Sequence, residues 1–450
     1  MKKRHSFSLE AAVFLILTVL LPVMLIVGAA ETGPQARPGM LFWLLLWLPI
    51  LLLVWLLWPV RAEEKNAPGP NEEPSEKVAS PAAQEFAASI GSIVEVKRTY
   101  VRNGVPVAEG KTRTPRERIF SQLELLLAPR QVTPLVEDAP GDEVKVSGVP
   151  LSTLNATRHK PRLLLHAGLF LATVATTLWV GGLQQGINLL KNPGQIAVAL
   201  PYAITLLAIL GIHELGHYFV ARRYGVDVTL PYFIPVPMGL GTFGAFIQMK
   251  SPMRSRRAIF DIAVAGPLAG LVVAVIALYF GLRQSGPIAG TGMTHGAMAS
   301  SSLLLALINK VSTGTPFGSG VIALSPVALA GWIGLFVTAL NLLPVGQLDG
   351  GHIAYALFGR RHAQAISGVV VAFMVALGLF MWPGLLTWAI IVALIAGFSH
   401  EPALDDVTPT DAKRVAIGAL TFILLLLILV PAPGASRQGM LNCPYMQGSR

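Results

Sequence analysis

Long apolar runs dominate this chain and restrict its fold more than any other feature. Lipid offers no partner to a backbone N–H or C=O group, so a segment that crosses a bilayer must satisfy these groups within a helix or a closed barrel. Most of the runs approach the roughly 20 residues that a spanning helix needs. The sequence therefore predicts a polytopic α-helical membrane protein with about nine spans, at about 11–30, 40–60, 163–183, 198–222, 258–282, 325–345, 364–382, 384–399 and 414–431.

Composition agrees with this prediction and excludes several other classes. Only 13% of the residues are charged and 53% are hydrophobic, whereas soluble domains carry about 25% charged residues. The single cysteine, Cys443, excludes a disulfide framework and a cysteine-based metal site, so histidine and carboxylate must hold any metal. The net charge of +10 does not predict a nucleic-acid partner. Residues 61–161 carry 14 basic and 14 acidic residues, so the basic excess surrounds the apolar runs, where it orients helices in the membrane.

The segment between the second and third runs differs from the rest of the chain. Residues 61–89 are rich in Pro, Glu and Ala and predict a flexible linker. Strand-like alternation over 93–101, an Asn103-Gly104 turn and a helix opened by Pro115 predict a small α+β domain. The expected domains are an N-terminal transmembrane hairpin and possible signal anchor at 1–60, the linker at 61–89, the α+β domain at 90–161, a transmembrane domain at 162–432 and a tail at 433–450.

The distribution of basic residues predicts the orientation. Outside 61–161, fourteen Lys and Arg residues fall in loops on one side of the predicted spans and six on the other. Because cytoplasmic loops carry the excess of Lys and Arg, we expect a cytoplasmic N-terminus and a cytoplasmic 61–161 domain.

The run at 198–222 contains His213-Glu214-Leu215-Gly216-His217. On a helix the two histidines are one turn apart and share a face, so both can reach one metal ion. Glu214 is offset by about 100° and is better placed to contact a water at that ion than to bind it. His-Glu-x-x-His is a zinc-protease pattern. At hydrocarbon depth these side chains need a metal, a partner or a water-filled cavity.

A catalytic zinc ion needs a third protein ligand and an open position. Asp349 is the best candidate, because few other acidic residues are associated with the apolar runs. The Gly350-Gly351 pair after it allows close backbone approach, and His352 is an alternative ligand on the same segment. Pro344 is expected to kink the preceding helix. The kink would turn Asn341 toward the site as a second stabilising donor.

Three other features have less specific interpretations. His166 is expected to be a core or interface histidine, and the polar stretch 400–406 is expected to be a solvated loop, with a lid as the alternative. Small residues around Gly266-Pro267 and Gly270 favour close helix packing. Residues 226–250 are too rich in proline and glycine for a spanning helix, so we expect a re-entrant β-hairpin at the membrane edge.

These motifs, in this order, resemble the site-2 protease (M50) family of intramembrane zinc metalloproteases. The resemblance covers about 160–410, and similarity to the cyanobacterial and plant-plastid branch rests on 241–247, 260–267 and 343–352. It implies that His213, His217 and Asp349 bind Zn²⁺ and that Glu214 is the general base. Many family members carry a PDZ domain, whereas this chain has no such segment and instead carries 61–161.

The resemblance implies a zinc endopeptidase that cleaves membrane-anchored proteins in or near the cytoplasmic half of the bilayer. Its expected partners are a transmembrane substrate, such as an anti-sigma factor, and the lipid bilayer, and its expected location is a bacterial inner membrane. Two alternatives stay open. A catalytically idle chaperone or scaffold would not need Glu214, and a divalent-metal transporter would need polar residues on several spans, of which there are few.

Overall fold

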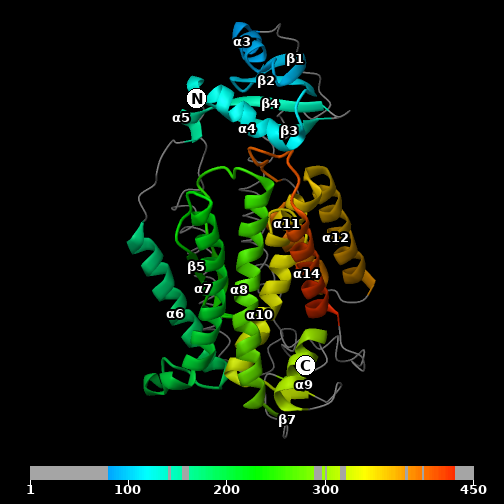
Figure 1. Ribbon diagram of the computed structural model, residues 1–450. Helices are drawn as coiled ribbons and strands as arrows, with labels where there is room; N and C mark the ends of the chain where they lie inside the picture. Colours follow the sequence, from blue (N-terminus) through cyan, green and yellow to red (C-terminus); the bar gives the residue numbers. More distant parts are fainter. Residues whose placement is uncertain are drawn as a thin grey trace. The chain divides into compact units, whose positions relative to one another are not determined.

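The computed structural model describes residues 80–139, 143–154, 162–287, 296–298, 302–314, 321–380, 384–397 and 400–430 (Figure 1). The chain divides into two compact units. One combines 1–78 with 236–240, and the other contains 79–235 and 241–450. The second unit holds nearly all of the described residues. The predicted spans at 11–30 and 40–60 lie outside the described residues.

Helices make up most of the second unit, as the sequence predicts. Among the described residues, five helices are long and apolar enough to cross a membrane: α6 (Leu163–Gln184), α7 (Leu200–Arg223), α8 (Arg256–Arg283), α12 (Arg360–Phe380) and α14 (Ala412–Leu429). Four shorter helices follow α8 in the chain: α9 (Leu303–Thr313), α10 (Pro326–Leu342), α11 (Asp349–Phe358) and α13 (Gly384–Ala396).

The predicted span at 325–345 is too long at its C-terminal end. α10 ends at Leu342, and Leu343 leaves the helical region with φ −57° and ψ 128°. The cause is Pro344, whose ring disfavours helical backbone at the residue before it. The chain then runs through a short irregular segment before α11 begins at Asp349. This break separates the elements that carry Asn341 and Asp349.

Helix α8 is the central element of the bundle. It contacts α7, α9, α10, α11 and α14 and lies in the middle of the helices in Figure 1. Small residues allow this close packing. A Cβ atom on Gly281 would overlap the backbone of Ala328 in α10, and one on Gly331 would lie 2.9 Å from the Leu278 side chain. In a bundle surrounded by lipid, such backbone contact replaces the hydrophobic effect as the driving force for association.

Residues 226–250 contain the predicted hairpin. Strands β5 (Tyr232–Pro235) and β6 (Thr242–Phe246) pair antiparallel, and a Val228–Met249 bridge continues the pairing. Gly241 and Gly244 have φ values of 84° and 102°, which glycine adopts without strain. Strand β5 packs against α6.

The small domain is an antiparallel sheet with two helices, which agrees with the α+β prediction. Its strands β1 (Val94–Arg102), β2 (Val105–Thr112), β3 (Val132–Ala139) and β4 (Glu143–Pro150) lie in the order β1-β2-β4-β3. Asn103 and Gly104 both have positive φ, as the predicted turn requires. The helices are α3 (Pro81–Ile90) and α4 (Arg116–Leu127). The short η1 (Ala128–Arg130) follows α4, and the short α5 (Leu151–Leu154) follows β4.

The domain begins earlier than predicted, because α3 begins at Pro81, inside the expected linker 61–89. Ser80 caps this helix by accepting a hydrogen bond from the Ala83 N–H, and Pro81 occupies its first turn. Phe86 and Ile90 are buried in the core of the domain. The Pro- and Ala-rich composition predicted a linker, whereas residues 81–90 form a helix with a buried apolar face.

Sequence reasoning also missed several elements outside the predicted spans. These are α9, the short helix η2 (Pro193–Val198) and a small sheet in the order β7-β9-β8, made of β7 (Gly286–Pro287), β9 (Val321–Ala323) and β8 (Gly296–Met298).

Candidate metal centre

Three predicted metal-ligating side chains meet between α7 and α11. His213 Nε2 and His217 Nε2 lie 3.2 Å apart, and each is 3.3 Å from Asp349 Oδ2. Both histidines are buried. Across the part of the chain that the structure describes, this is the one group of three such side chains close enough to share a metal ion.

The spacing of these atoms fits a tetrahedral zinc ion. Zinc binds imidazole nitrogen and carboxylate oxygen at about 2.0–2.2 Å, which places neighbouring ligand atoms of a tetrahedron roughly 3.3–3.5 Å apart. The three observed separations of 3.2, 3.3 and 3.3 Å agree with this value. Two imidazoles and one carboxylate also leave a fourth position open, which is the ligand set of a catalytic rather than a structural site.

A main-chain carbonyl of α8 orients His217. Nδ1 of His217 lies 2.7 Å from the carbonyl oxygen of Ile262. Because a carbonyl only accepts, Nδ1 must carry the proton, and the lone pair of Nε2 is free to bind a metal ion. A hydrogen bond of this kind fixes the tautomer and ring orientation of a metal-binding histidine.

Glycines of α8 make room for both imidazole rings. A Cβ atom on Gly266 would overlap the ring of His217, and one on Gly270 would lie 3.1 Å from the Cβ of His213. In the other direction, a Cβ on Gly216 would lie 2.7 Å from the carbonyl oxygen of Ala265. The close helix packing predicted around Gly266 and Gly270 therefore places the α8 backbone directly against the candidate ligands.

Glu214 lies beside the three ligands and is buried. Its carboxylate accepts a hydrogen bond from the backbone N–H of Ile247, the residue directly after β6. The carboxylate also interacts electrostatically with His217 and Asp349. Glu214 therefore connects the metal centre with the β5–β6 hairpin.

Asn341 reaches the site from the last turn of α10. Its Nδ2 atom lies 3.3 Å from His213 Nε2. The Gly350-Gly351 pair explains how Asp349 comes so close to the end of α10. Cβ atoms there would overlap backbone atoms of Leu342 and Gly346, so residues with side chains could not start α11 at this place.

Two further histidines lie outside the group of three. The His352 ring faces the ring of His400, with centroids 5.7 Å apart. Nδ1 of His166 lies 3.2 Å from the carbonyl oxygen of Pro231, and its ring contacts Tyr232 with centroids 4.1 Å apart. His166 therefore joins α6 to the hairpin, which is the interface role expected for it.

The expectation of a solvated loop at 400–406 is wrong. His400, Asp405 and Asp406 are each less than a tenth exposed. They are buried because the loop packs against α11 and the small domain: the Tyr355 hydroxyl donates to Asp406 at 2.7 Å, and Leu404 and Val407 enter a hydrophobic core. Apolar Leu404 and Val407 on either side of the two acids were the available signal, but the acids suggested exposure to water.

A second polar cluster closes the bundle at the end of α7. Nε and Nη2 of Arg414 lie 2.8 Å and 2.6 Å from the Asp261 carboxylate, and the Tyr224 hydroxyl donates to the same group. These residues come from α14, α8 and the C-terminal end of α7, so the cluster is an internal brace. The sequence alone does not show which cationic side chain pairs with Asp261.

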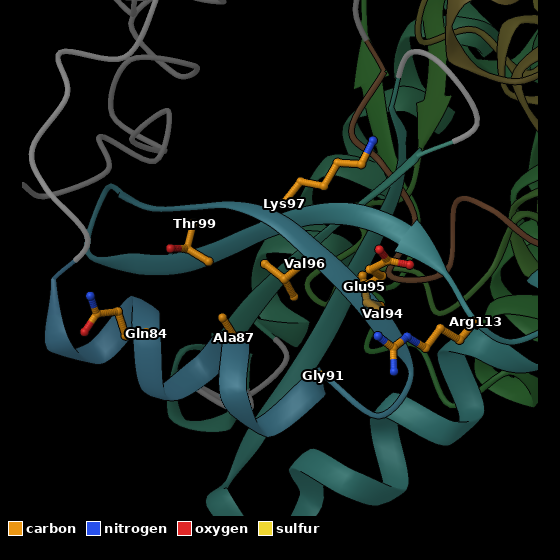
Figure 2. A pocket seen from close by; sticks show the side chains of 9 residues that line it. All are labelled: Gln84, Ala87, Gly91, Val94, Glu95, Val96, Lys97, Thr99 and Arg113. Atoms are coloured by element: carbon orange, nitrogen blue, oxygen red, sulfur yellow. The ribbon is translucent and has the colours of Figure 1, made fainter.

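A groove on the small domain does not contain the candidate residues. It lies between α3 and β1, has a volume of about 470 Å³ and is lined by Gln84, Lys97, Thr99 and Arg113 among others (Figure 2). The metal centre belongs to the helical bundle instead.

Comparison with known proteins identifies the bundle. Residues 201–382 match the model of peptidase family M50. The chain is 30% identical over 332 residues to "Probable zinc metalloprotease EGY2, chloroplastic" of Arabidopsis thaliana. This aligned region covers 72% of the chain and 59% of that protein. It is 36% identical over 240 residues to "Probable zinc metalloprotease EGY1, chloroplastic" of the same plant, and this aligned region covers 52% of the chain and 43% of that protein.

The chain spans about half the length of the curated relatives it matches. No solved structure matches it. The matched segment begins at the second residue of α7 and includes all four metal-centre residues of α7 and α11, as well as Asn341. The chain thus carries a peptidase family M50 domain.

Proposed function

We propose that this chain is an intramembrane zinc metalloendopeptidase that cleaves membrane-anchored proteins. The observation that carries the proposal is the equal spacing of His213 Nε2, His217 Nε2 and Asp349 Oδ2 within a bundle of apolar helices. These three residues would hold Zn²⁺. Bound zinc supplies a Lewis acid, which polarises the scissile carbonyl and lowers the pKa of a coordinated water.

Glu214 is positioned to move the proton in this reaction. It would take a proton from the attacking water and deliver it to the leaving amine, as a general base and then a general acid. The Asn341 amide lies 3.3 Å from His213 Nε2 and would donate a hydrogen bond to the carbonyl oxygen as negative charge develops there. Burial of Glu214 keeps competing bulk water away from its carboxylate.

A transmembrane substrate must unwind before it can react, because its carbonyls are held in helical hydrogen bonds. Strand β6 offers an edge for the unwound segment. The Gln248 N–H faces the hairpin, since it donates to Thr229 Oγ1 at 3.0 Å. Successive N–H groups of a strand point to opposite edges, so those of Ala245 and Ile247 point away from β5. Ile247 donates to Glu214, which leaves the Ala245 N–H for the substrate. We propose that the substrate pairs with this outer edge.

We also propose the finer features of membrane placement. The chain would cross the membrane about nine times, with the small domain on the cytoplasmic side, where the basic loop residues concentrate. Its substrates would be membrane-anchored regulators, for example an anti-sigma factor. The expected bacterial inner membrane finds no support in the comparisons, because the named relatives are chloroplastic, so the proposal is an integral membrane protein only.

Replacing Glu214 by Gln tests the proposal against its alternatives. The amide keeps the shape but cannot accept the proton, so we expect cleavage of membrane-anchored substrates to fall by about 10²–10⁴-fold with one zinc ion still bound. Glu401→Gln, which changes an exposed glutamate, is the control. If the cellular function is unchanged in Glu214→Gln, the idle chaperone is favoured. If the chain carries metal across the membrane at a rate that the substitution does not change, the transporter is favoured.

A further inference from the structure

The segment Ala403–Val407, called here the strap, pairs with strand β3 of the small domain through one parallel β-bridge. The Val136 N–H donates to the Leu404 carbonyl at 2.8 Å, and the Asp406 N–H donates to the Val136 carbonyl at 3.0 Å. Strand β3 is an edge of the four-stranded sheet, so the strap covers backbone groups that would otherwise be unpaired.

Apolar side chains anchor the strap to the same domain. Leu404 and Val407 are 8% and 3% exposed and belong to the hydrophobic core that contains Leu123 and Val136. On its other side the strap bonds to the residues that precede α8. The Leu404 N–H donates to the Met253 carbonyl and the Asp405 N–H to the Arg254 carbonyl, each at 2.9 Å. The strap is therefore held between the sheet and the start of α8.

The strap also holds α11 through Tyr355. This side chain is fully buried. Its hydroxyl donates to Asp406 Oδ1 at 2.7 Å and accepts from the Ala403 N–H at 3.0 Å, so both ends of the strap bind one oxygen atom. The ring of His400, just before the strap, stacks on the Tyr355 ring with centroids 5.2 Å apart and planes 9° apart.

α11 needs such support more than α7 does. His213 and His217 lie on a helix of 24 residues that packs along α8 and α10. Asp349 is the first residue of a helix of only ten residues, which follows the break at Pro344. Helices this short are marginal without tertiary contacts, so contacts made by α11 itself determine where the Asp349 carboxylate lies. Tyr355 is six residues away on the same helix.

We propose that Tyr355 is a positioning residue for Asp349. Through the contacts of Tyr355 with the strap, docking of the small domain would control the geometry of the metal centre. The inference rests on the proposed function, because it treats Asp349 as a zinc ligand. The small domain thereby acts as a support for the active site: when it is docked, α11 is fixed and the three ligands are assembled. When it is released, Asp349 is free to move away from the two histidines.

The test compares zinc affinity and hydrogen exchange in the full chain. Tyr355→Phe keeps the ring but removes the hydroxyl that binds the strap. We expect about 10-fold weaker zinc binding in competition with a chelator, a typical effect of removing support for a metal ligand, together with faster exchange over α11. Tyr279→Phe is the matched control, because its hydroxyl has an Arg283 partner in the same helix. Zinc affinity equal to wild type in Tyr355→Phe would overturn the proposal.

A second variant tests the coupling from the opposite end. Leu404→Ala combined with Val407→Ala removes the anchors from the small domain without touching Tyr355. We expect faster exchange in β3 and α11 together, and weaker zinc binding. Faster exchange in β3 alone, with unchanged zinc affinity, would overturn the coupling but leave the proposed function intact. A wild-type chain that binds no zinc would instead refute the proposed function, so the two failures are distinguishable.

Discussion

At the scale of residues, the sequence was most informative where chemistry depends on side-chain type and spacing. His213, Glu214 and His217 follow from a helical spacing, and Asp349 follows from the scarcity of acids near the apolar runs. The Ile262 carbonyl that orients His217 could not be predicted, since every residue has a carbonyl and no sequence pattern shows which one is free to accept. The approach of Asn341 to the site depends on the break at Pro344. The sequence predicted a kink there but not the path of the chain after it.

Gly266 tests the proposed packing of α8 against the metal centre. A Cβ atom there would overlap the His217 ring, so Gly266→Ala should displace this imidazole and lower zinc affinity by about tenfold or more. Gly368→Ala in α12 is the control, since nothing lies within 4 Å of its Cβ position. Zinc content and cleavage rate should both fall in the first variant and stay unchanged in the second. Normal zinc content in Gly266→Ala would show that the ring has room to move.

At the scale of elements, hydropathy located the helices but not their ends or their contacts. The run at 325–345 includes Leu343 and Pro344, which are apolar but not helical, so a hydropathy window continues past the end of α10. The strap was misassigned for the opposite reason. Its acidic residues suggested a solvated loop, whereas Asp406 is satisfied by Tyr355, a partner 51 residues away in the chain.

The Arg414 brace provides a prediction at this scale. Its two hydrogen bonds to Asp261 join α14 to α8. Lysine cannot reproduce this bidentate geometry, so Arg414→Lys should lower the free energy of unfolding by about 1–3 kcal/mol, measured as a lower thermal midpoint in detergent. Arg283→Lys, which alters a contact with Tyr279 at the far end of α8, should change it much less. Equal midpoints for the two variants would exclude the brace.

At the scale of the whole molecule, the helical membrane part and the separate α+β domain could be predicted, but their connection could not. The length of an apolar run and the alternation of a strand are local signals, and the helices and strands that they predict are present in the structure. The bond between Val136 and Leu404 joins residues 268 positions apart, from segments that were assigned to a cytoplasmic domain and a solvated loop. No periodicity in either segment indicates the other, because their complementarity exists only after both have folded.

This connection contains two buried groups whose protonation should affect docking in opposite directions. Burial raises the pKa of Asp406 from 3.8 to about 6, and burial lowers the pKa of His400 from 6.5 to about 4. Tyr355, Arg256, Glu137 and Asp138 act on the first group, and His352 and Arg360 act on the second. The docked state therefore binds the Asp406 proton more tightly than the released state does, and the His400 proton less tightly.

The two effects should separate in single variants. His400→Phe keeps the aromatic contact and leaves Asp406, whose protonation favours docking, so exchange protection in β3 should increase as the pH falls from 7 to 4. Asp406→Asn leaves His400, which must lose its charge to stay docked, so protection should decrease as the pH falls through 6.5 toward 4. Wild type should vary less than either, because the opposing contributions partly cancel. If both variants followed the wild-type profile after correction for intrinsic exchange rates, neither group would control the docking of the small domain.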